Sequence, residues 1–198
     1  MAQRLAILAL LVAAVTAGAC GDRPATQLPP GPSGSTAAPT RLATLASTPP
    51  GVVARVSRVV DGDTFKVDVA GRTDTVRVIG LDTPESVKPG TPVECFALRA
   101  SAEAKRLLPA GAAVRLQADP TQAARDRYGR LLAHVWLADG TLYAERMIRG
   151  GFAIHYIYED VPSVYASRLA AAEAGARAEL TGLWSPSTCA GNAHTPAL

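Results

Sequence analysis

The sequence lacks an apolar run long enough to cross a membrane. Its one extended apolar stretch, residues 5–19, reads LAILALLVAAVTAGA, whereas a membrane-spanning helix needs about 20 residues. The stretch follows a short basic start that includes Arg4, and it ends in small residues before Cys20. This arrangement is typical of a secretory signal peptide rather than of a buried helix. We therefore expect residues 1–19 to be a signal peptide and the protein to be exported.

Large apolar side chains are scarce in the segment that follows. Residues 21–51 contain seven of the fifteen prolines, and Ser, Thr, Gly and Ala make up most of the rest. Such a segment cannot bury enough surface to offset its ordering entropy, so we interpret residues 20–51 as a flexible tether. The remainder, residues 52–198, has the length of one domain with a hydrophobic core.

A strong net charge is missing too. The whole chain carries a formal charge of +3, and residues 52–198 contain 17 basic and 16 acidic residues. A nearly neutral domain does not attract nucleic acid by diffuse electrostatics. Lysine is rare in this domain, where only Lys66, Lys88 and Lys105 occur. The other basic residues are arginines, which favour bidentate contacts to phosphate, although an arginine-rich genome would produce the same bias.

Apolar periodicity within the domain predicts five strands and three helices. The expected strands are residues 52–60, 64–69, 75–81, 114–118 and 131–137. The expected helices are residues 95–108, 142–149 and 162–180. The order is three strands, a helix, two strands and two helices, which favours an α+β fold built on a five-stranded, partly open OB-fold β-barrel.

Two acidic segments stand out. In VVDGDTFKV, residues 59–67, Asp61 and Gly62 suffice for a hairpin turn, so the second carboxylate, Asp63, is surplus to the turn. In RVIGLDTPE, residues 77–85, an Asp-Thr-Pro turn follows a strand. Each segment alone is adequately explained as a turn. Arg77 shares the parity of Thr75, opposite the apolar face, so beside these carboxylates it is a candidate phosphate clamp.

Two further segments carry charged and aromatic side chains. RDRYGRLLAHV, residues 125–135, has a turn at Tyr128 followed closely by Arg130, and by itself it could be a charged loop. HYIYED, residues 155–160, has two tyrosines two positions apart. In an extended segment both rings lie on one face, where they either pack on the barrel or stack on bases.

VDGDT, RVIGLDTPE, DRYGR and the later GLW together resemble the recurring segments of the thermonuclease, or staphylococcal nuclease, family. They occur in the family's order over residues 52–184. The resemblance implies an OB-fold nuclease that uses one Ca²⁺ to hydrolyse the phosphodiester bonds of DNA and RNA by attack of water.

The resemblance also implies a role for each matching residue. Asp63 and Asp82 would be carboxylate ligands of the metal, and Thr83 would contribute its main-chain carbonyl. Glu85 would orient or deprotonate the attacking water, while Arg77 and Arg130 would bind the scissile phosphate. Asp61 would support the metal ligands without touching the ion. Arg127, Tyr128 and Tyr156 would contact the nucleotide. Arg127 stands where the family has lysine. Ala97 and Arg99 depart from a common Gly and Glu of the family, next to the loop of residues 86–93 and outside the metal site.

Elementary electrostatics agrees with a metal site. Carboxylates about 4 Å apart repel by roughly 1–4 kcal/mol per pair, so a cluster of them calls for a cation. The acidic segments contain no His or Cys, and an oxygen-only ligand set argues against Zn²⁺ and for a hard ion. The choice of Ca²⁺ over Mg²⁺ follows from the resemblance alone. The alternatives are an OB-fold module that binds nucleic acid without cutting it and an adhesion domain, which would present a large apolar patch.

The chain has three cysteines, of which Cys95 and Cys189 lie inside the domain. An exported domain meets an oxidising compartment, so we expect these two to form a disulfide. Cys20 is then the odd cysteine. TAGAC, residues 16–20, resembles a lipoprotein cleavage site, which predicts a lipid on Cys20 and attachment to a membrane. Residues 17–19 also fit ordinary signal cleavage, which would release a soluble protein. We expect a monomer in either case.

Overall fold

The computed structural model describes residues 49–87 and 89–197. Five strands form a closed barrel in the order β1-β2-β3-β6-β5. All neighbouring pairs are antiparallel except β3 and β6, which run parallel. The strands are β1 (Val52–Val59), β2 (Thr64–Val69), β3 (Arg72–Val78), β5 (Ala113–Gln117) and β6 (Leu131–Trp136). The α+β fold with a five-stranded barrel is confirmed, and the barrel is closed because β5 pairs with β1.

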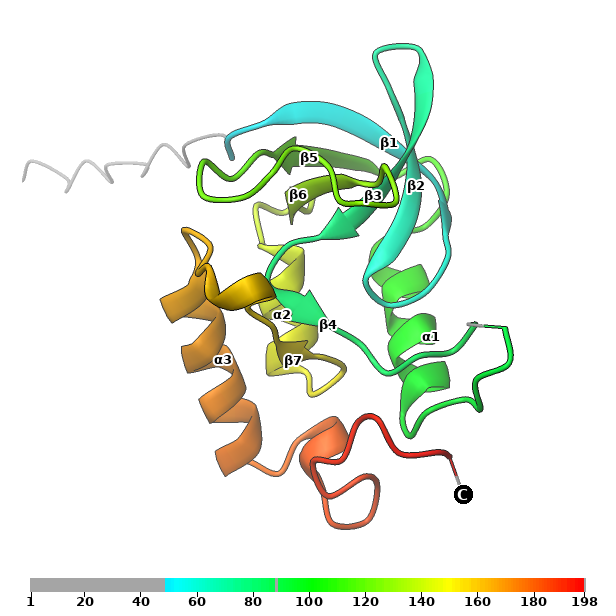
Figure 1. Ribbon diagram of the computed structural model, residues 1–198, viewed down its shortest axis with the longest axis vertical. Coiled ribbons are helices and arrows are strands. Elements are labelled where there is room, and N and C mark those ends of the chain that lie inside the picture. Colours follow the sequence, from blue (N-terminus) through cyan, green and yellow to red (C-terminus); the bar gives the residue numbers. More distant parts are fainter. Residues whose placement is uncertain (1–48, 88, 198) are drawn as a thin grey trace, which may run out of the picture. The chain divides into compact units, whose positions relative to one another are not determined.

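Three α-helices accompany the barrel and lie below it in Figure 1. They are α1 (Ala97–Leu107), α2 (Tyr143–Arg149) and α3 (Ala166–Ala178). The three predicted helices are therefore confirmed. Within the part of the chain that the structure describes, no helix combines the length and apolar character needed to span a bilayer.

The core fills the barrel and the space between the barrel and the helices. Alternate residues of the strands point inward, as with Phe65 and Val67 in β2 and Val76 and Val78 in β3, all of them buried. Burial of each such side chain stabilises the fold by about 1.5–3 kcal/mol. Arg77 lies between two inward-facing valines, so strand geometry directs it away from the core, as its sequence parity predicts.

The third strand lies three residues earlier than predicted. Its connection to β2 is the two-residue turn Ala70-Gly71, with φ of 49° and 76°, rather than the five residues left between the predicted strands 64–69 and 75–81. Two consecutive residues with positive φ fit the right-handed twist of a hairpin, so Arg72 pairs directly with Val69. The strand ends at Val78, two residues before Gly80, which has a φ of 86°.

Two helices begin later than predicted. α1 begins at Ala97 rather than at residue 95, because Phe96 has a left-handed backbone with φ of 69°. α3 begins at Ala166 rather than at residue 162. Backbone groups just before it form hydrogen bonds with side chains outside the helix: the Val164 amide donates to Asp119, and the Pro162 carbonyl accepts from Thr121.

A second, two-stranded sheet lies below the barrel. β4 (Leu81–Asp82) pairs antiparallel with β7 (Ile154–His155). The 3₁₀ helices η1 (Tyr158–Asp160) and η2 (Gly182–Trp184) complete the secondary structure of the described residues. The β4–β7 pairing matters for function because it holds Asp82 beside the segment that carries Tyr156.

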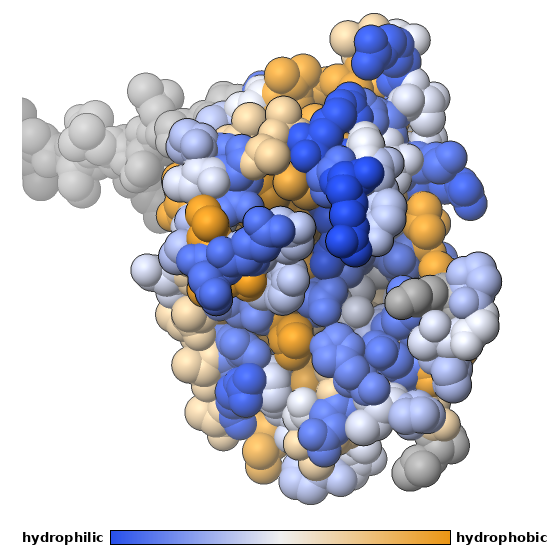
Figure 2. Space-filling view, viewed as in Figure 1, coloured by the Kyte–Doolittle hydropathy of each residue, from blue (hydrophilic) through white to orange (hydrophobic). Residues whose placement is uncertain are grey.

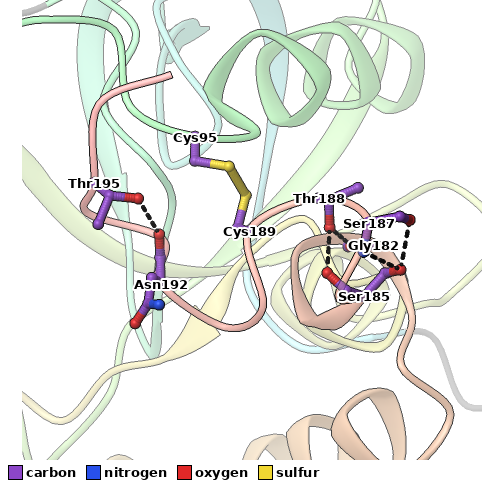
Figure 3. The surroundings of a disulfide bond; sticks show 8 residues. All are labelled: Cys95, Gly182, Ser185, Ser187, Thr188, Cys189, Asn192 and Thr195. Carbon is purple, nitrogen blue, oxygen red and sulfur yellow. Dashed lines mark hydrogen bonds between the residues drawn. A yellow bond between two sulfur atoms is a disulfide. The ribbon is translucent and has the colours of Figure 1, made fainter. Parts of the chain in front are cut away.

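The C-terminal segment returns to the start of α1. The sulfurs of Cys95 and Cys189 are bonded, with their Cα atoms 5.9 Å apart, and Figure 3 shows the bond joining the two segments. The predicted signal peptide, residues 1–19, lies outside the described residues, as do Cys20 and nearly all of the predicted tether.

Candidate active site

The acidic segments meet in a hollow of about 420 Å³ where β3 leads out of the barrel into β4. The turn between β1 and β2 supplies one wall, the end of β3 and β4 another, and the segment just before β6 a third. The hollow is lined by the predicted metal and catalytic residues and by several others: Asp61, Asp63, Thr64, Arg77, Asp82, Thr83, Pro84, Glu85, Thr91, Glu94, Tyr128, Arg130 and His194. The structure therefore brings all six predicted metal and catalytic residues, and Asp61, to one place.

The turn of residues 60–63 is fixed by its own side chains and by close packing. Asp61 Oδ1 accepts hydrogen bonds from the Asp63 and Thr64 amides at 3.2 and 2.8 Å. A Cβ atom on Gly62 would lie 2.6 Å from Thr83 Cγ2, so only glycine allows the turn to approach Thr83 this closely. The buried Tyr143 hydroxyl donates to the Gly62 carbonyl at 2.7 Å. Asp61 thus shapes the turn that presents Asp63.

Arg77 bridges the two aspartates predicted to bind metal. Its Nη1 lies 2.6 Å from Asp63 Oδ2, and its Nη2 donates to Asp82 Oδ1 at 2.8 Å. Nη1 also donates to the Leu81 carbonyl at 3.0 Å. The three side chains are largely withdrawn from solvent, so each charge depends on its partners. In this arrangement Arg77 holds the carboxylates together, and a bound phosphate would have to share its donors.

The hollow contains more negative charge than its arginines neutralise. Burial and then the neighbouring charge of Asp63 raise the pKa of Asp61 to about 7. Burial also raises the pKa of Asp82, although Arg77 opposes this effect. A carboxyl pKa rises when the ionised form lacks sufficient compensation, so a cation in the hollow would be favourable.

The ligand set fits a hard ion with several water ligands. Among residues 49–87 and 89–197, no three His, Cys, Asp or Glu side chains converge on one point. An ion held by Asp63, Asp82 and the Thr83 carbonyl would therefore complete its shell with water. Ca²⁺ takes 6–8 oxygen ligands in flexible geometry and fits these residues, whereas a structural Zn²⁺ would need four fixed nitrogen or sulfur ligands.

Glu85 begins a loop whose ends are tied together by Glu94. The Glu85 amide donates to Glu94 Oε2 at 2.6 Å, and the Glu94 amide donates to the Glu85 carbonyl at 2.9 Å. Glu85 Oε1 accepts a hydrogen bond from the Val87 amide at 2.9 Å. Glu94 is a site residue that the sequence analysis missed, because nothing in its surroundings, ECFALRAS at residues 94–101, distinguishes it from a surface carboxylate.

Arg130 is oriented by Asp126, another residue that the sequence analysis missed. Arg130 Nε donates to Asp126 Oδ2 at 2.6 Å, and the Arg130 amide donates to Oδ1 at 2.9 Å. Burial tends to raise the pKa of Asp126, but hydrogen bonds from Arg130 outweigh it and the pKa is lowered. The paired carboxylate holds Nε and leaves the terminal nitrogens for the hollow, where Nη1 lies 3.5 Å from Thr64 Oγ1.

A second hollow, of about 550 Å³, adjoins the first and shares Arg77, Asp82, Tyr128 and Arg130 with it. It contains the predicted substrate-binding residues Arg127, Tyr128 and Tyr156, together with Tyr158. Tyr128, Tyr156 and Tyr158 are 68%, 42% and 50% exposed. The Arg127 guanidinium lies 4.8 Å from the centre of the Tyr128 ring. Exposed rings beside an arginine can receive nucleic-acid bases and phosphate.

The two walls of this second hollow are joined by the buried Asp119. Its Oδ2 lies 2.7 Å from His134 Nε2 and accepts from the Val164 amide at 2.9 Å. Beside it, Thr121 Oγ1 donates to the Pro162 carbonyl at 3.0 Å. Asp119 and His134 are fully buried at the side chain. These contacts fix the segment of Arg127 and Tyr128 relative to the segment of Tyr156.

This buried pair predicts a loss of stability in acid. Although burial opposes it, hydrogen bonds from His134 and Thr121 lower the pKa of Asp119 from 3.8 to about 2. Burial lowers the pKa of His134 from 6.5, against the effect of Asp119. The unfolded chain therefore takes up a proton at His134 as the pH falls below 6.5, and another at Asp119 below about 4. Both proton uptakes favour unfolding.

His134→Gln keeps an amide donor for Asp119 and removes the titrating imidazole. Other groups also titrate in this range, because folded Asp61 takes up a proton near pH 7 and that uptake favours the folded state. We therefore expect a difference between the two proteins: on going from pH 7.5 to pH 5.0, the melting temperature of wild type should change less favourably than that of the variant. Thermal unfolding at the two pH values measures the difference. Equal changes in the two proteins would show that His134 does not contribute to the acid sensitivity.

On the face shown in Figure 2, hydrophilic side chains gather over the middle. Hydrophobic residues of the described part of the chain form only small separate patches on this face. This face does not present the large apolar patch expected of an adhesion domain.

Comparisons with known proteins point to nucleases. Residues 75–186 match the family described as "Staphylococcal nuclease homologue". The thermonuclease of Staphylococcus hyicus is 40% identical over 132 residues, which cover 66% of this chain and 75% of that protein. The thermonuclease of Staphylococcus intermedius is 44% identical over 98 residues, covering 50% and 56% of the two chains. Endonuclease YncB of Bacillus subtilis (strain 168) is 37% identical over 133 residues, covering 67% and 61%. The chain thus spans less than two thirds of the last two relatives.

Proposed function

The chain belongs to the staphylococcal nuclease family, and we propose that it is a calcium-dependent nuclease that hydrolyses the phosphodiester bonds of DNA and RNA. One observation carries the proposal: a single hollow gathers Asp63, Asp82 and Glu85 with two arginines. Carboxylates for a cation, a candidate base and donors for phosphate are the parts that this reaction requires.

Asp63, Asp82 and the main-chain carbonyl of Thr83 would hold the calcium ion. When bound, the ion neutralises charge on the phosphate and polarises its oxygens. Asp61 supports this arrangement through the two amides that it holds in the turn before Asp63.

The protein's own residues would divide the remaining work. Glu85 orients the attacking water and takes its proton, while Arg77 and Arg130 bind the phosphate through their terminal nitrogens. General-base action supplies about 10²–10⁴ of the rate, whereas the most demanding hydrolyses need enhancements of about 10¹⁷ or more. Stabilisation of charge in the transition state therefore has to supply the larger part of the rate enhancement.

The neighbouring hollow would hold the rest of the substrate. In this proposal Arg127 and Tyr128 would contact phosphate and Tyr156 would contact a base, and all three residues line that hollow. Aromatic rings stack on any base with little regard for the sugar, which supports activity on both DNA and RNA. Unpaired bases can reach the rings, so single-stranded or frayed substrates should be cleaved faster than paired ones.

The experiment that tests the proposal uses end-labelled single strands of DNA and RNA with the same sequence, incubated with the purified protein and Ca²⁺. We expect both strands to be shortened on a denaturing gel. Full-length strands that are retarded on a native gel would instead support the alternative, a module that binds nucleic acid without cutting it.

We also propose that the protein is exported as a monomer and attached to a membrane through a lipid on Cys20. The short apolar run of residues 5–19, the TAGAC sequence and the proline-rich segment after it support this location. Residues 20–51 would then hold the nuclease domain away from the membrane surface.

Cys20→Ala removes the residue that would carry the lipid. We expect it to move nuclease activity from the membrane fraction to the medium or periplasm, with no change in specific activity because Cys20 precedes the domain. Fractionation followed by an activity assay measures the shift. An unmutated protein that is already soluble, with a free α-amino group on Cys20, would contradict the anchor and support release after ordinary signal cleavage.

A further inference from the structure

Residues 189–197, called the C-terminal strap below, run back to the candidate active site. The disulfide holds one end of the strap at Cys95 (Figure 3). Further along, the Cys95 amide donates to the Thr195 carbonyl at 2.7 Å, and the Ala197 amide donates to the Val93 carbonyl at 2.8 Å. The family match ends at residue 186, so the strap lies beyond the part of the chain that the match covers.

The path of the strap is set by packing as well as by the disulfide. Gly191 has a φ of 84°, and a Cβ atom there would lie 3.0 Å from the Trp184 ring. Its amide donates to the Leu183 carbonyl at 2.9 Å. Ala193 is buried, with 3% of its surface exposed. These contacts give His194, the next residue, a defined position at the edge of the hollow.

His194 reaches two carboxylates of the hollow. Its Nδ1 lies 3.1 Å from Glu94 Oε2, and its Nε2 lies 3.7 Å from Asp82 Oδ2. An ionised carboxylate only accepts hydrogen bonds, so we assign the hydrogen on the ring to Nδ1, which donates the hydrogen bond to Glu94. The same Oε2 accepts the Glu85 amide at 2.6 Å. Glu94 is thus held from one side by the strap and holds Glu85 from the other.

We propose that His194 is a positioning residue of this nuclease, which fixes Glu94 so that Glu94 fixes the backbone of Glu85. The disulfide and the strap hold His194 in place. The inference rests on the proposed function, because the consequence of misplacing Glu85 is a loss of turnover. Displacing a catalytic group by about 1 Å can cost about 10²-fold in rate, so a residue that never touches substrate can still govern kcat.

A purely structural role for the His194–Glu94 pair predicts a different result. His194 is 54% exposed at the side chain, and pairs at such exposed sites contribute little to stability. Loss of a structural pair would lower the melting temperature slightly and leave kcat unchanged. A positioning role predicts the reverse, with a lower kcat and an almost unchanged melting temperature.

The experiment compares three variants of the full chain on single-stranded DNA. His194→Ala should lower kcat by about 10–100-fold, the usual effect of losing a residue that orients a catalytic or ligating group, with KM little changed. His194→Asn should recover most of the rate, because its amide nitrogen can take the place of Nδ1 and donate to Glu94. Ser187→Ala, in the preceding loop with its hydroxyl bonded only to Ser185 among the described residues, should behave as wild type.

Hydrogen exchange at the Glu85 amide gives a readout that does not depend on activity. The exchange should be faster in His194→Ala than in wild type and should return toward the wild-type rate in His194→Asn. Equal exchange rates in wild type and His194→Ala would overturn the inference. If the wild-type protein cleaves no nucleic acid, the proposed function fails, and the exchange rates still decide whether His194 holds Glu85.

A double replacement, Cys95→Ser with Cys189→Ser, tests whether the disulfide holds His194 in position. Freeing the strap should lower kcat about as much as His194→Ala does, and adding His194→Ala should then have little further effect. Full kcat in His194→Ala would contradict the positioning role, and full kcat in the folded double variant would contradict the part that the disulfide plays in holding His194.

Discussion

Replacing Glu85 with Gln is expected to lower kcat by about 10²–10⁴-fold, the usual contribution of a general base. The amide is the same size but cannot accept the proton of the attacking water. The melting temperature should barely change, because the Glu85 backbone keeps its hydrogen bonds with Glu94. Steady-state cleavage of single-stranded DNA and a thermal melt measure the two quantities.

Glu103→Gln is the matched control for this change. Glu103 lies on α1, where its carboxylate pairs with Arg106, and it lines neither hollow. The control should keep the wild-type kcat. A near-normal rate in Glu85→Gln would remove Glu85 from the mechanism and leave water activation to another group.

Arg130→Ala should lower kcat by about 10²–10³-fold, the loss expected when one donor to a developing anion is removed. Arg130→Lys should recover little of it, because an ammonium group cannot reproduce the two-pronged contact of a guanidinium with phosphate. Stability should change little, since the side chain lies at the edge of the barrel with 30% of its surface exposed. Cleavage kinetics and thermal melts of both variants provide the test.

Arg106→Ala serves as the control for Arg130→Ala, because Arg106 is exposed on α1 and pairs only with Glu103 among the described residues. It should cleave at the wild-type rate. The kcat of Asp126→Asn should lie between those of Arg106→Ala and Arg130→Ala, because this change weakens the contact that orients Arg130 and leaves the guanidinium present. An Arg130→Ala variant as active as Arg106→Ala would exclude Arg130 from the reaction.

The alternation of apolar and polar residues predicted the barrel strands, because successive side chains of a barrel strand point alternately into the core and away from it. The alternation in TFKVDV and the opposite parity of Arg77 and Val76 correspond to buried and outward-facing positions in β2 and β3. The errors at the start of β3 and of α1 have local conformational causes, whereas the late start of α3 comes from the distant contacts of Asp119 and Thr121. Positive φ at Ala70 and at Phe96 is rare for such residues, so no pattern of side chains indicated it.

The site residues that the sequence did not reveal act across long separations. His194 meets Glu94 across 100 residues, and Asp119 meets the Val164 amide across 45. Neither contact has a spacing rule, because the tertiary fold alone brings the partners together. Asp126 is different: it lies only four residues from Arg130, inside the segment that carried the resemblance, and its role as the partner of Arg130 could have been inferred from the turn.

The contact between Arg77 and both aspartates affects the balance of charge in the candidate site. A guanidinium that already pairs with Asp63 and Asp82 supplies part of the positive charge that the carboxylates need. Burial is the largest cause of the raised pKa of Asp61 and of Asp82, and at Asp82 Arg77 offsets it only in part. Calcium would make up the difference, and it would leave the donors of Arg77 available for phosphate.

The most direct test of the proposed calcium dependence is the initial rate of single-stranded DNA cleavage with excess chelator, followed by titration with Ca²⁺. We expect no measurable cleavage in chelator and a rate that rises to saturation as free Ca²⁺ increases. Asp82→Asn should require more Ca²⁺ to reach half its own maximal rate, because a ligand charge is lost. Cleavage at the full rate in excess chelator would show that the site does not use Ca²⁺.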